Sequence, residues 1–236
     1  MVQLSIAGTE DIYKVTPSKI IALGLNYMDH VNERGVLHSE PNAQEKPTEP
    51  VLFPKSPNVL IGPGEPIVIP SFLKEYNFDE PRVDHEAELA VIIGKKCKNV
   101  SEEEALDCVF GYTCFNDVSQ RNLQGADKSG WFRGKSLDTF GPIGPQLVKA
   151  EDVSDPQSLD IRCRLNGKVV QESNTSKMIF PVAFTIAFIS KHFTLEPGDI
   201  IVTGTPSGVG PLHHGDVVEI EIEGIGVLRN PVVEEE

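Results

Sequence analysis

Two glutamates in an apolar strand could bind one cation. Residues 84–93 read Asp-His-Glu-Ala-Glu-Leu-Ala-Val-Ile-Ile, which predicts a strand over Ala87–Ile93. Side chains alternate faces along a strand, so Glu86 and Glu88 share one face, ~6.5 Å apart along it. That face continues into apolar residues, so two like charges meet at the edge of a buried surface and need a compensating cation.

A solvated strand face is the competing interpretation, because alternating glutamates often mark exposed strands. The chain contains such an example in Glu219-Ile-Glu221-Ile-Glu223, which predicts a strand over 217–223 with its glutamates in solvent. The apolar continuation beyond Glu88 favours a cation site for the first pattern.

Asp117 is a third acid that could join this site. It ends the predicted strand 111–117, where an aspartate that starts a turn is an equally good explanation. Three carboxylates would form a hard oxygen site suited to Mg²⁺ or Mn²⁺, and Ca²⁺ would also fit. The H-E-x-x-H zinc motif is absent, because its second histidine position is Leu89.

His30 and Glu33 could form a general base. Their i, i+3 spacing places them on one face of a short helix predicted over about 26–33. A carboxylate that binds an imidazole fixes its tautomer and raises its basicity. An ordinary surface pair has the same spacing, so the pattern leaves both interpretations open.

The glycine-rich run 204–210 is a further candidate. It lacks the Gly-Lys-Ser/Thr of a phosphate-binding P-loop and opens no obvious helix. It predicts either a tight turn or a backbone that approaches a ligand closely.

Most elements that must carry these residues are strands. Asn166-Gly167 between the apolar-rich segments 160–165 and 168–172 predicts a hairpin, and Ile200–Val202 predicts a buried strand. Many strands with few helices favour a mixed, mainly β core over a regular βαβ winding.

Two further helices are predicted. Ser101 and Glu104 form a capping-box pattern before a helix that should run through 105–110. Pro181 suits the first turn of a helix that ends near Phe193.

Composition bounds the remaining possibilities. The chain has 236 residues, 39% of them hydrophobic, enough for one large core in one or two domains. Its net charge of −14 argues against nucleic-acid binding. The four cysteines include no C-x-x-C pair, and the sequence shows no signal-peptide pattern. The longest apolar stretch, 178–189, is too short to span a bilayer. These features predict a cytoplasmic protein without membrane contact.

Taken in order and spacing, several segments resemble the fumarylacetoacetate hydrolase family, in its short single-domain branch. That branch includes acylpyruvate hydrolases, oxaloacetate decarboxylases and bacterial 2-hydroxyhepta-2,4-diene-1,7-dioate isomerases. The resemblance covers about 19–233, and the segments that carry it are 24–30, 54–56, 84–94, 115–124, 134–145 and 195–210.

The resemblance implies a mixed α/β, mainly β fold: a β-sheet roll or sandwich of the fumarylacetoacetase C-terminal-domain type with a few short helices, usually as a homodimer. A short N-terminal segment with a lid (1–50) would precede the catalytic domain (51–236), and the polar, proline-rich 40–50 would mark the boundary. The implied metal ligands are Glu86, Glu88 and Asp117, the implied catalytic residues are His30, Glu33 and Lys135, and the implied substrate contacts are Arg121, Gln124, Lys55 and Thr205.

The implied activity is divalent-metal-dependent hydrolysis of a carbon–carbon bond in acylpyruvate-type 2,4-diketo acids, through a stabilised enolate. The alternatives are an isomerase or decarboxylase of 2-hydroxyhepta-2,4-diene-1,7-dioate-type intermediates, an oxaloacetate decarboxylase, and a non-catalytic scaffold. The partner is a small 2-keto acid. Segments 34–50 and 71–84 depart from the family pattern and leave the particular acid open.

Overall fold

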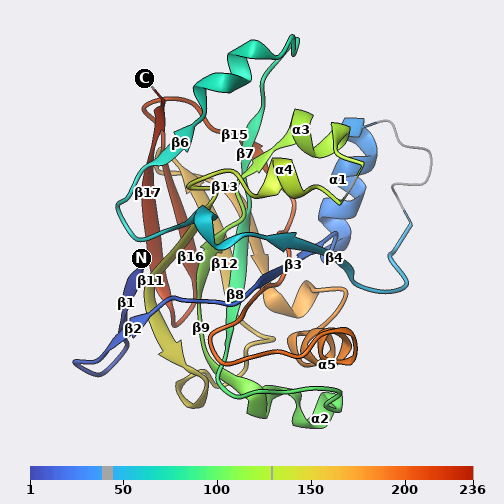
Figure 1. The fold of residues 1–236 in the computed structure, drawn as a ribbon, viewed down its shortest axis with the longest axis vertical. Coiled ribbons are helices and arrows are strands. Elements are labelled where there is room, and N and C mark those ends of the chain that lie inside the picture. Colours follow the sequence, from blue (N-terminus) through green and yellow to red (C-terminus); the bar gives the residue numbers. More distant parts are fainter. Residues whose placement is uncertain (39–44, 129, 236) are drawn as a thin grey trace.

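Short apolar runs that end in turn residues form most of the strands. The computed structural model describes residues 1–38, 45–128 and 130–235, and within these residues the strands form three sheets (Figure 1). The fold is mixed α/β and mainly β, which confirms the predicted class.

The largest sheet has nine strands and holds β8 near its middle. In spatial order it contains β2 (Ile12–Lys14), β1 (Gln3–Ile6), β11 (Gly141–Lys149), β9 (Val109–Asn116), β8 (Ala87–Ile93), β14 (Ile200–Val202), β3 (Ile20–Gly24) and β4 (Val51–Lys55), with β5 (Leu60–Ile61) paired to β11.

The second sheet lies against the first. It contains β13 (Lys168–Asn174), β12 (Asp160–Leu165), β16 (Val217–Ile222), β17 (Gly226–Glu234) and β6 (Ile67–Ile69). The third sheet is small and contains β10 (Ser119–Gln120), β7 (Val83–His85) and β15 (Gly210–Pro211).

The helices are short. They are α1 (Met28–His38), α2 (Glu102–Ala105), α3 (Arg121–Ala126), α4 (Phe132–Lys135) and α5 (Val182–His192). Single 3₁₀ turns are η1 (Pro57–Val59), η2 (Ser71–Glu75), η3 (Leu106–Cys108), η4 (Ala150–Asp152) and η5 (Thr175–Lys177). Figure 1 shows α1, α3 and α4 gathered on one side of the molecule and α2 and α5 at its lower end.

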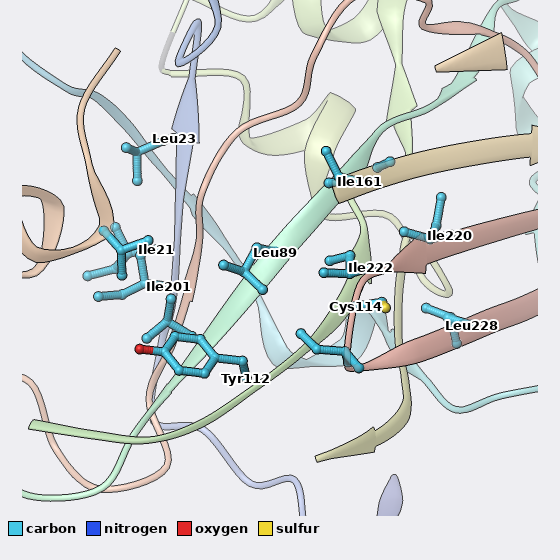
Figure 2. Close-up of a cluster of buried hydrophobic side chains, with 14 of the residues drawn as sticks. Ile21, Leu23, Leu89, Tyr112, Cys114, Ile161, Ile201, Ile220, Ile222 and Leu228 are labelled. Atoms are coloured by element: carbon cyan, nitrogen blue, oxygen red, sulfur yellow. The ribbon is translucent and has the colours of Figure 1, made fainter. Parts of the chain in front are cut away.

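The core between the two large sheets anchors β8. Figure 2 shows Leu89 of β8 with Ile161, Ile220, Ile222 and Leu228, which come from three strands of the second sheet. All five side chains are at most 1% exposed. Truncation of such a leucine typically costs ~2–5 kcal/mol, so this strand is held rigidly at the level of its glutamates.

The hairpin prediction is confirmed. Asn166 and Gly167 both have positive φ, 52° and 79°, as a type I′ turn requires, and they join β12 to β13. The 217–223 prediction is also confirmed: the isoleucines of β16 are buried, whereas Glu219 and Glu221 are partly exposed and pair with arginines.

The helix predictions are partly wrong. The capping box at Ser101 is present, but α2 and η3 end at Cys108, and Val109 pairs with Ile93 in the sheet. The β-branched and aromatic residues at positions 109–110 favour the strand, which ends the helix early. α5 agrees with its prediction, and α1 is longer than predicted, ending at His38.

Part of the predicted boundary segment 40–50 lies outside the described residues, and 45–50 form neither helix nor strand. Strands β1 and β3 belong to the same sheet as β8, and the division at residue 50 stays a prediction. Within the described residues, no helix combines the length and the apolar character needed to cross a membrane.

Candidate metal centre

Three carboxylates from neighbouring strands converge on one point. Glu86 joins β7 to β8, Glu88 lies in β8, and Asp117 directly follows β9. β8 and β9 are antiparallel neighbours, and the Asp117 amide donates to the Glu86 carbonyl at 2.9 Å, so the strand ends bring the acids together. One oxygen from each side chain lies within 4.8 Å of the others, and all three residues are buried.

Two of the three acids have cationic partners. Lys135 Nζ lies 2.8 Å from Glu86 Oε2 and 2.5 Å from Asp117 Oδ2. Lys55 Nζ lies 2.5 Å from Asp117 Oδ1, and Arg121 Nη1 lies 2.6 Å from Glu86 Oε1. Each contact is short and charge-assisted.

Glu88 differs from its two neighbours. It forms no ion pair with any described residue; its Oε2 accepts a bond from the Gly204 amide at 2.5 Å, and its Oε1 is buried without a described partner. An unpartnered buried carboxylate oxygen is costly, so this atom is a candidate ligand for a cation.

The charge balance separates the pKa values of the two glutamates. Burial alone would raise the pKa of Glu86, but the positive charges of Lys135 and Arg121 outweigh it and hold that pKa well below its usual range. Burial raises the pKa of Glu88, and the negative charges of Asp117 and Glu86 raise it further. Glu88 is therefore the acid of the three that an added positive charge would stabilise most.

A divalent cation fits this donor set. Three carboxylates provide hard oxygen ligands of the kind that Mg²⁺ and Mn²⁺ prefer. A cation among them would supply a partner for Glu88 Oε1 and remove the repulsion between Glu88 and its two neighbours.

The two lysines occupy different positions. Burial alone would lower the pKa of Lys135, but Asp117 and Glu86 raise it above the usual value, so its ammonium stays charged at the pocket wall. Burial lowers the pKa of Lys55, although Asp117 opposes the shift. Lys55 donates to Asp117 and to the carbonyl of Lys135 and is not among the residues that line the pocket.

The predicted contact between His30 and Glu33 is formed. His30 Nδ1 lies 3.1 Å from Glu33 Oε2, and the other Glu33 oxygen accepts from the Gly208 amide at 3.0 Å. Glu33 engages Nδ1 of the imidazole, and His30 lines the same pocket as Glu86 and Glu88.

The pocket contains most of the predicted substrate contacts. Arg121 Nη1 donates to Gln124 Oε1 at 3.0 Å, while Arg121 Nη2 is buried without a hydrogen-bond partner among the described residues. The residues that line this pocket are Leu23, Gly24, Leu25, His30, Phe53, Glu86, Glu88, Arg121, Gln124, Trp131, Lys135 and Thr205.

Two residues of the site were missed by the sequence reasoning. Asp84 accepts from Arg121 Nε at 2.8 Å, and its position two residues before Glu86 on an alternating strand could have indicated it. Trp131 packs so closely on Gly24 that a Cβ there would lie 2.7 Å from the indole, and no sequence signal indicates this contact.

Residues 19–233 match the family described as fumarylacetoacetate (FAA) hydrolase C-terminal. The chain belongs to the fumarylacetoacetate hydrolase family. The match spans nearly the whole chain and confirms the resemblance in the sequence. The chain is a metal-dependent enzyme of this family, and Glu86, Glu88 and Asp117 are its metal-ligand candidates.

Three relatives within the family illustrate its range. An oxaloacetate tautomerase of Xenopus laevis is 47% identical over 92% of this chain and 66% of its own length. The 2-hydroxyhepta-2,4-diene-1,7-dioate isomerase structure of Mycobacterium marinum is 42% identical, with a TM-score of 0.79 and coverage of 94% and 76% of the two chains. The fumarylpyruvate hydrolase of Pseudomonas aeruginosa, solved with Mn²⁺ and pyruvate, is 30% identical, with a TM-score of 0.85 and coverage of 99% and 96%.

Proposed function

We propose that this enzyme hydrolyses a carbon–carbon bond in acylpyruvate-type 2,4-diketo acids and depends on Mg²⁺ or Mn²⁺. The observation that carries the proposal is the His30–Glu33 pair, because His30, which we infer to be the general base, lines the same pocket as Glu86 and Glu88. Cleavage by water needs such a base, whereas metal binding alone does not. The Mn²⁺–pyruvate complex of the Pseudomonas aeruginosa relative supports a 2-keto acid in this pocket.

The divalent ion, when bound by Glu86, Glu88 and Asp117, would supply Lewis-acid polarisation of the 2-keto acid. Arg121 Nη2, a buried donor without a described partner, is suited to a substrate carboxylate. Thr205 lines the same pocket and offers a hydroxyl.

The proton movements can be assigned to His30. Its Nε2 takes a proton from water, and the hydroxyl adds to the distal carbonyl carbon. The bond between that carbon and C3 then breaks, and its electron pair forms the enolate of pyruvate. The Lys135 ammonium, which stays charged because its pKa is raised by Asp117 and Glu86 against the effect of burial, stabilises the enolate oxygen. His30 returns its proton to C3, so the products are a carboxylic acid and pyruvate.

A second candidate is proton transfer without cleavage, as in a tautomerase or isomerase. The 47% identity to the Xenopus laevis oxaloacetate tautomerase and the 42% identity to the Mycobacterium marinum isomerase favour it. In that reaction His30 would move a proton between carbon and the enol oxygen, and no water would be consumed. Decarboxylation of oxaloacetate would use the same enolate.

The deciding experiment is an activity panel with the purified protein and added Mg²⁺ or Mn²⁺. Its substrates are acetylpyruvate, fumarylpyruvate, oxaloacetate and 2-hydroxyhepta-2,4-diene-1,7-dioate. We expect pyruvate from an acylpyruvate, and none after chelation of the metal. Rapid loss of enol-oxaloacetate or of the diene diacid, with no acylpyruvate cleaved, would establish the second candidate instead. A homodimer and a cytoplasmic location remain predictions.

A further inference from the structure

One buried glutamine joins the second sheet to the active-site segment 204–208. Gln171 of β13 is 1% exposed, and both ends of its amide are engaged. Its Oε1 accepts from the Ala87 amide at 3.0 Å, and its Nε2 donates to Thr205 Oγ1 at 2.9 Å and to the Pro206 carbonyl at 2.8 Å.

The orientation of this amide is fixed by main-chain groups. The Ala87 N–H can only donate and the Pro206 carbonyl can only accept, so a flipped amide would lose both bonds. Ala87 lies between Glu86 and Glu88, so the side chain connects the strand that carries two of the acids with the segment that carries Thr205.

A β-bulge brings the same part of β13 against the segment. The register of β12 and β13 shifts between Cys163, opposite Gln171, and Arg164, opposite Val169, which leaves Val170 as the extra residue. A Cβ built on Gly208 would lie 2.0 Å from the Val170 carbonyl oxygen, so the two backbones are in close contact.

The segment held in this way contacts several parts of the site. Gly204 donates to Glu88, Thr205 lines the pocket, and the Gly208 amide binds Glu33. A displacement of the segment would therefore change three things together: the contact of Glu88, the lining of the pocket and the contact of Glu33, which binds His30.

We propose that Gln171 is a positioning residue, which holds segment 204–208 in register with the Glu86–Glu88 strand and so sets the geometry of the metal and substrate sites. The inference rests on the proposed function for what the site binds. Residues that orient metal ligands typically contribute 10- to 100-fold to metal affinity or activity.

The test compares Gln171→Met with Asn230→Leu in the full-length protein. Asn230 is an equally buried amide whose Nδ2 donates to the carbonyls of Gly62 and Glu65, at 2.9 and 2.8 Å, and it does not line the pocket. We expect Gln171→Met to weaken Mn²⁺ binding in calorimetry by ~10- to 100-fold. Amide hydrogen exchange of 203–210 in the metal-free protein should also accelerate. Asn230→Leu should lower the free energy of unfolding but leave both readouts at the wild-type values.

Gln171→Glu is the second variant: it keeps an acceptor for Ala87 and for His85 Nδ1, and it replaces the amide donor that faces Pro206 and Thr205 with an ionisable carboxyl group. This variant should also bind Mn²⁺ more weakly and exchange the amides of 203–210 faster. It should raise the KM for the acylpyruvate substrate more than a loss of stability alone would. The proposal is overturned if folded variants bind Mn²⁺ and exchange like the wild type, or if neither variant folds while Asn230→Leu does. Wild-type protein that binds no Mn²⁺ would refute the proposed function instead, and the exchange experiment would still test Gln171.

Discussion

Lys55 Nζ lies 2.5 Å from Asp117 Oδ1, and neither side chain has any exposed surface. The ammonium also donates to the main-chain carbonyl of Lys135. Lys55 therefore contacts both Asp117, a metal-ligand candidate, and the backbone of Lys135, whose side chain lines the pocket. The resemblance implies that Lys55 contacts the substrate. Its position outside the pocket lining favours support of Asp117 and α4 instead.

The main effect of replacing Lys55 should therefore be a loss of stability and not a loss of substrate contacts. Lys55→Met leaves the Asp117 carboxylate buried with one cationic partner fewer, and we expect a loss of ~3 kcal/mol of unfolding free energy in the metal-free protein. Urea denaturation measures it. Lys74→Met, which removes an exposed pair with Glu234, is the control and should stay within ~1 kcal/mol of wild type. Equal losses in the two variants would contradict the prediction.

Removal of one acid should abolish metal binding. Glu86→Ala deletes a ligand candidate, and calorimetric titration should detect no Mn²⁺ binding where the wild type binds. Glu219→Ala is the matched control, because Glu219 belongs to the other alternating-glutamate strand and is partly exposed. Full Mn²⁺ affinity in Glu86→Ala would show that the three acids are not the metal site.

Glu88 should give the metal-free protein an unusual pH dependence. Burial and then the charges of Asp117 and Glu86 raise the pKa of Glu88 well above its usual 4.5, so the folded state keeps a proton that the unfolded chain releases. Stability contributed by this group is present below pH 4.5 and is lost as pH rises toward the folded pKa.

Denaturation in the presence of a chelator, at a series of pH values above 4.5, measures this effect. Glu88→Gln should lose less stability with rising pH than the wild type. Burial lowers the pKa of His85, which gives an opposite slope, but that contribution is shared by both proteins and cancels in the comparison. Burial opposes the shift, but Lys135 and Arg121 lower the pKa of Glu86. Its titration therefore changes stability only below the pH range of this experiment. Parallel curves for the two proteins would contradict the assignment.

Local patterns predicted what depends on neighbours in the chain. The alternation in 84–93 defined β8 and placed Glu86 and Glu88 on one face, and Asn166-Gly167 defined the hairpin turn. The i, i+3 spacing of His30 and Glu33 indicated their contact.

Contacts between distant segments carried no such signal. Gln171 reaches Ala87 across 84 positions and Thr205 across 34, and Lys55 reaches Asp117 across 62. These contacts depend on how two sheets pack and on a bulge at Val170, and neither feature leaves a periodic pattern in the sequence. The length of α2 was mispredicted for a related reason, since pairing with β8 draws Val109 into the sheet.

The histidine should be required for hydrolysis but not for metal binding. We expect His30→Ala to reduce kcat for acylpyruvate cleavage by at least ~100-fold, the usual effect of losing a general base, while Mn²⁺ affinity stays near wild type. His213→Ala, at an exposed position, serves as the control. Decarboxylation of oxaloacetate that persists in His30→Ala would fit a route without water. Acylpyruvate cleavage at the wild-type rate in this variant would exclude the proposed role.

Two glycines with similar backbone angles should respond differently to an added methyl group. Gly208 has φ +96° and Gly215 has φ +89°, so alanine costs ~1–2 kcal/mol of conformational strain at either position. At Gly215 the new Cβ meets nothing within 4 Å, whereas at Gly208 it meets the Val170 carbonyl oxygen at 2.0 Å. The backbone at Gly208 must therefore shift, and with it the amide that binds Glu33. We expect Gly208→Ala to lose more unfolding free energy than Gly215→Ala and to lose kcat as well, because the orientation of His30 depends on Glu33. Denaturation and steady-state kinetics measure both effects, and equal kcat values in the two variants would show that the Gly208 contact does not orient the base.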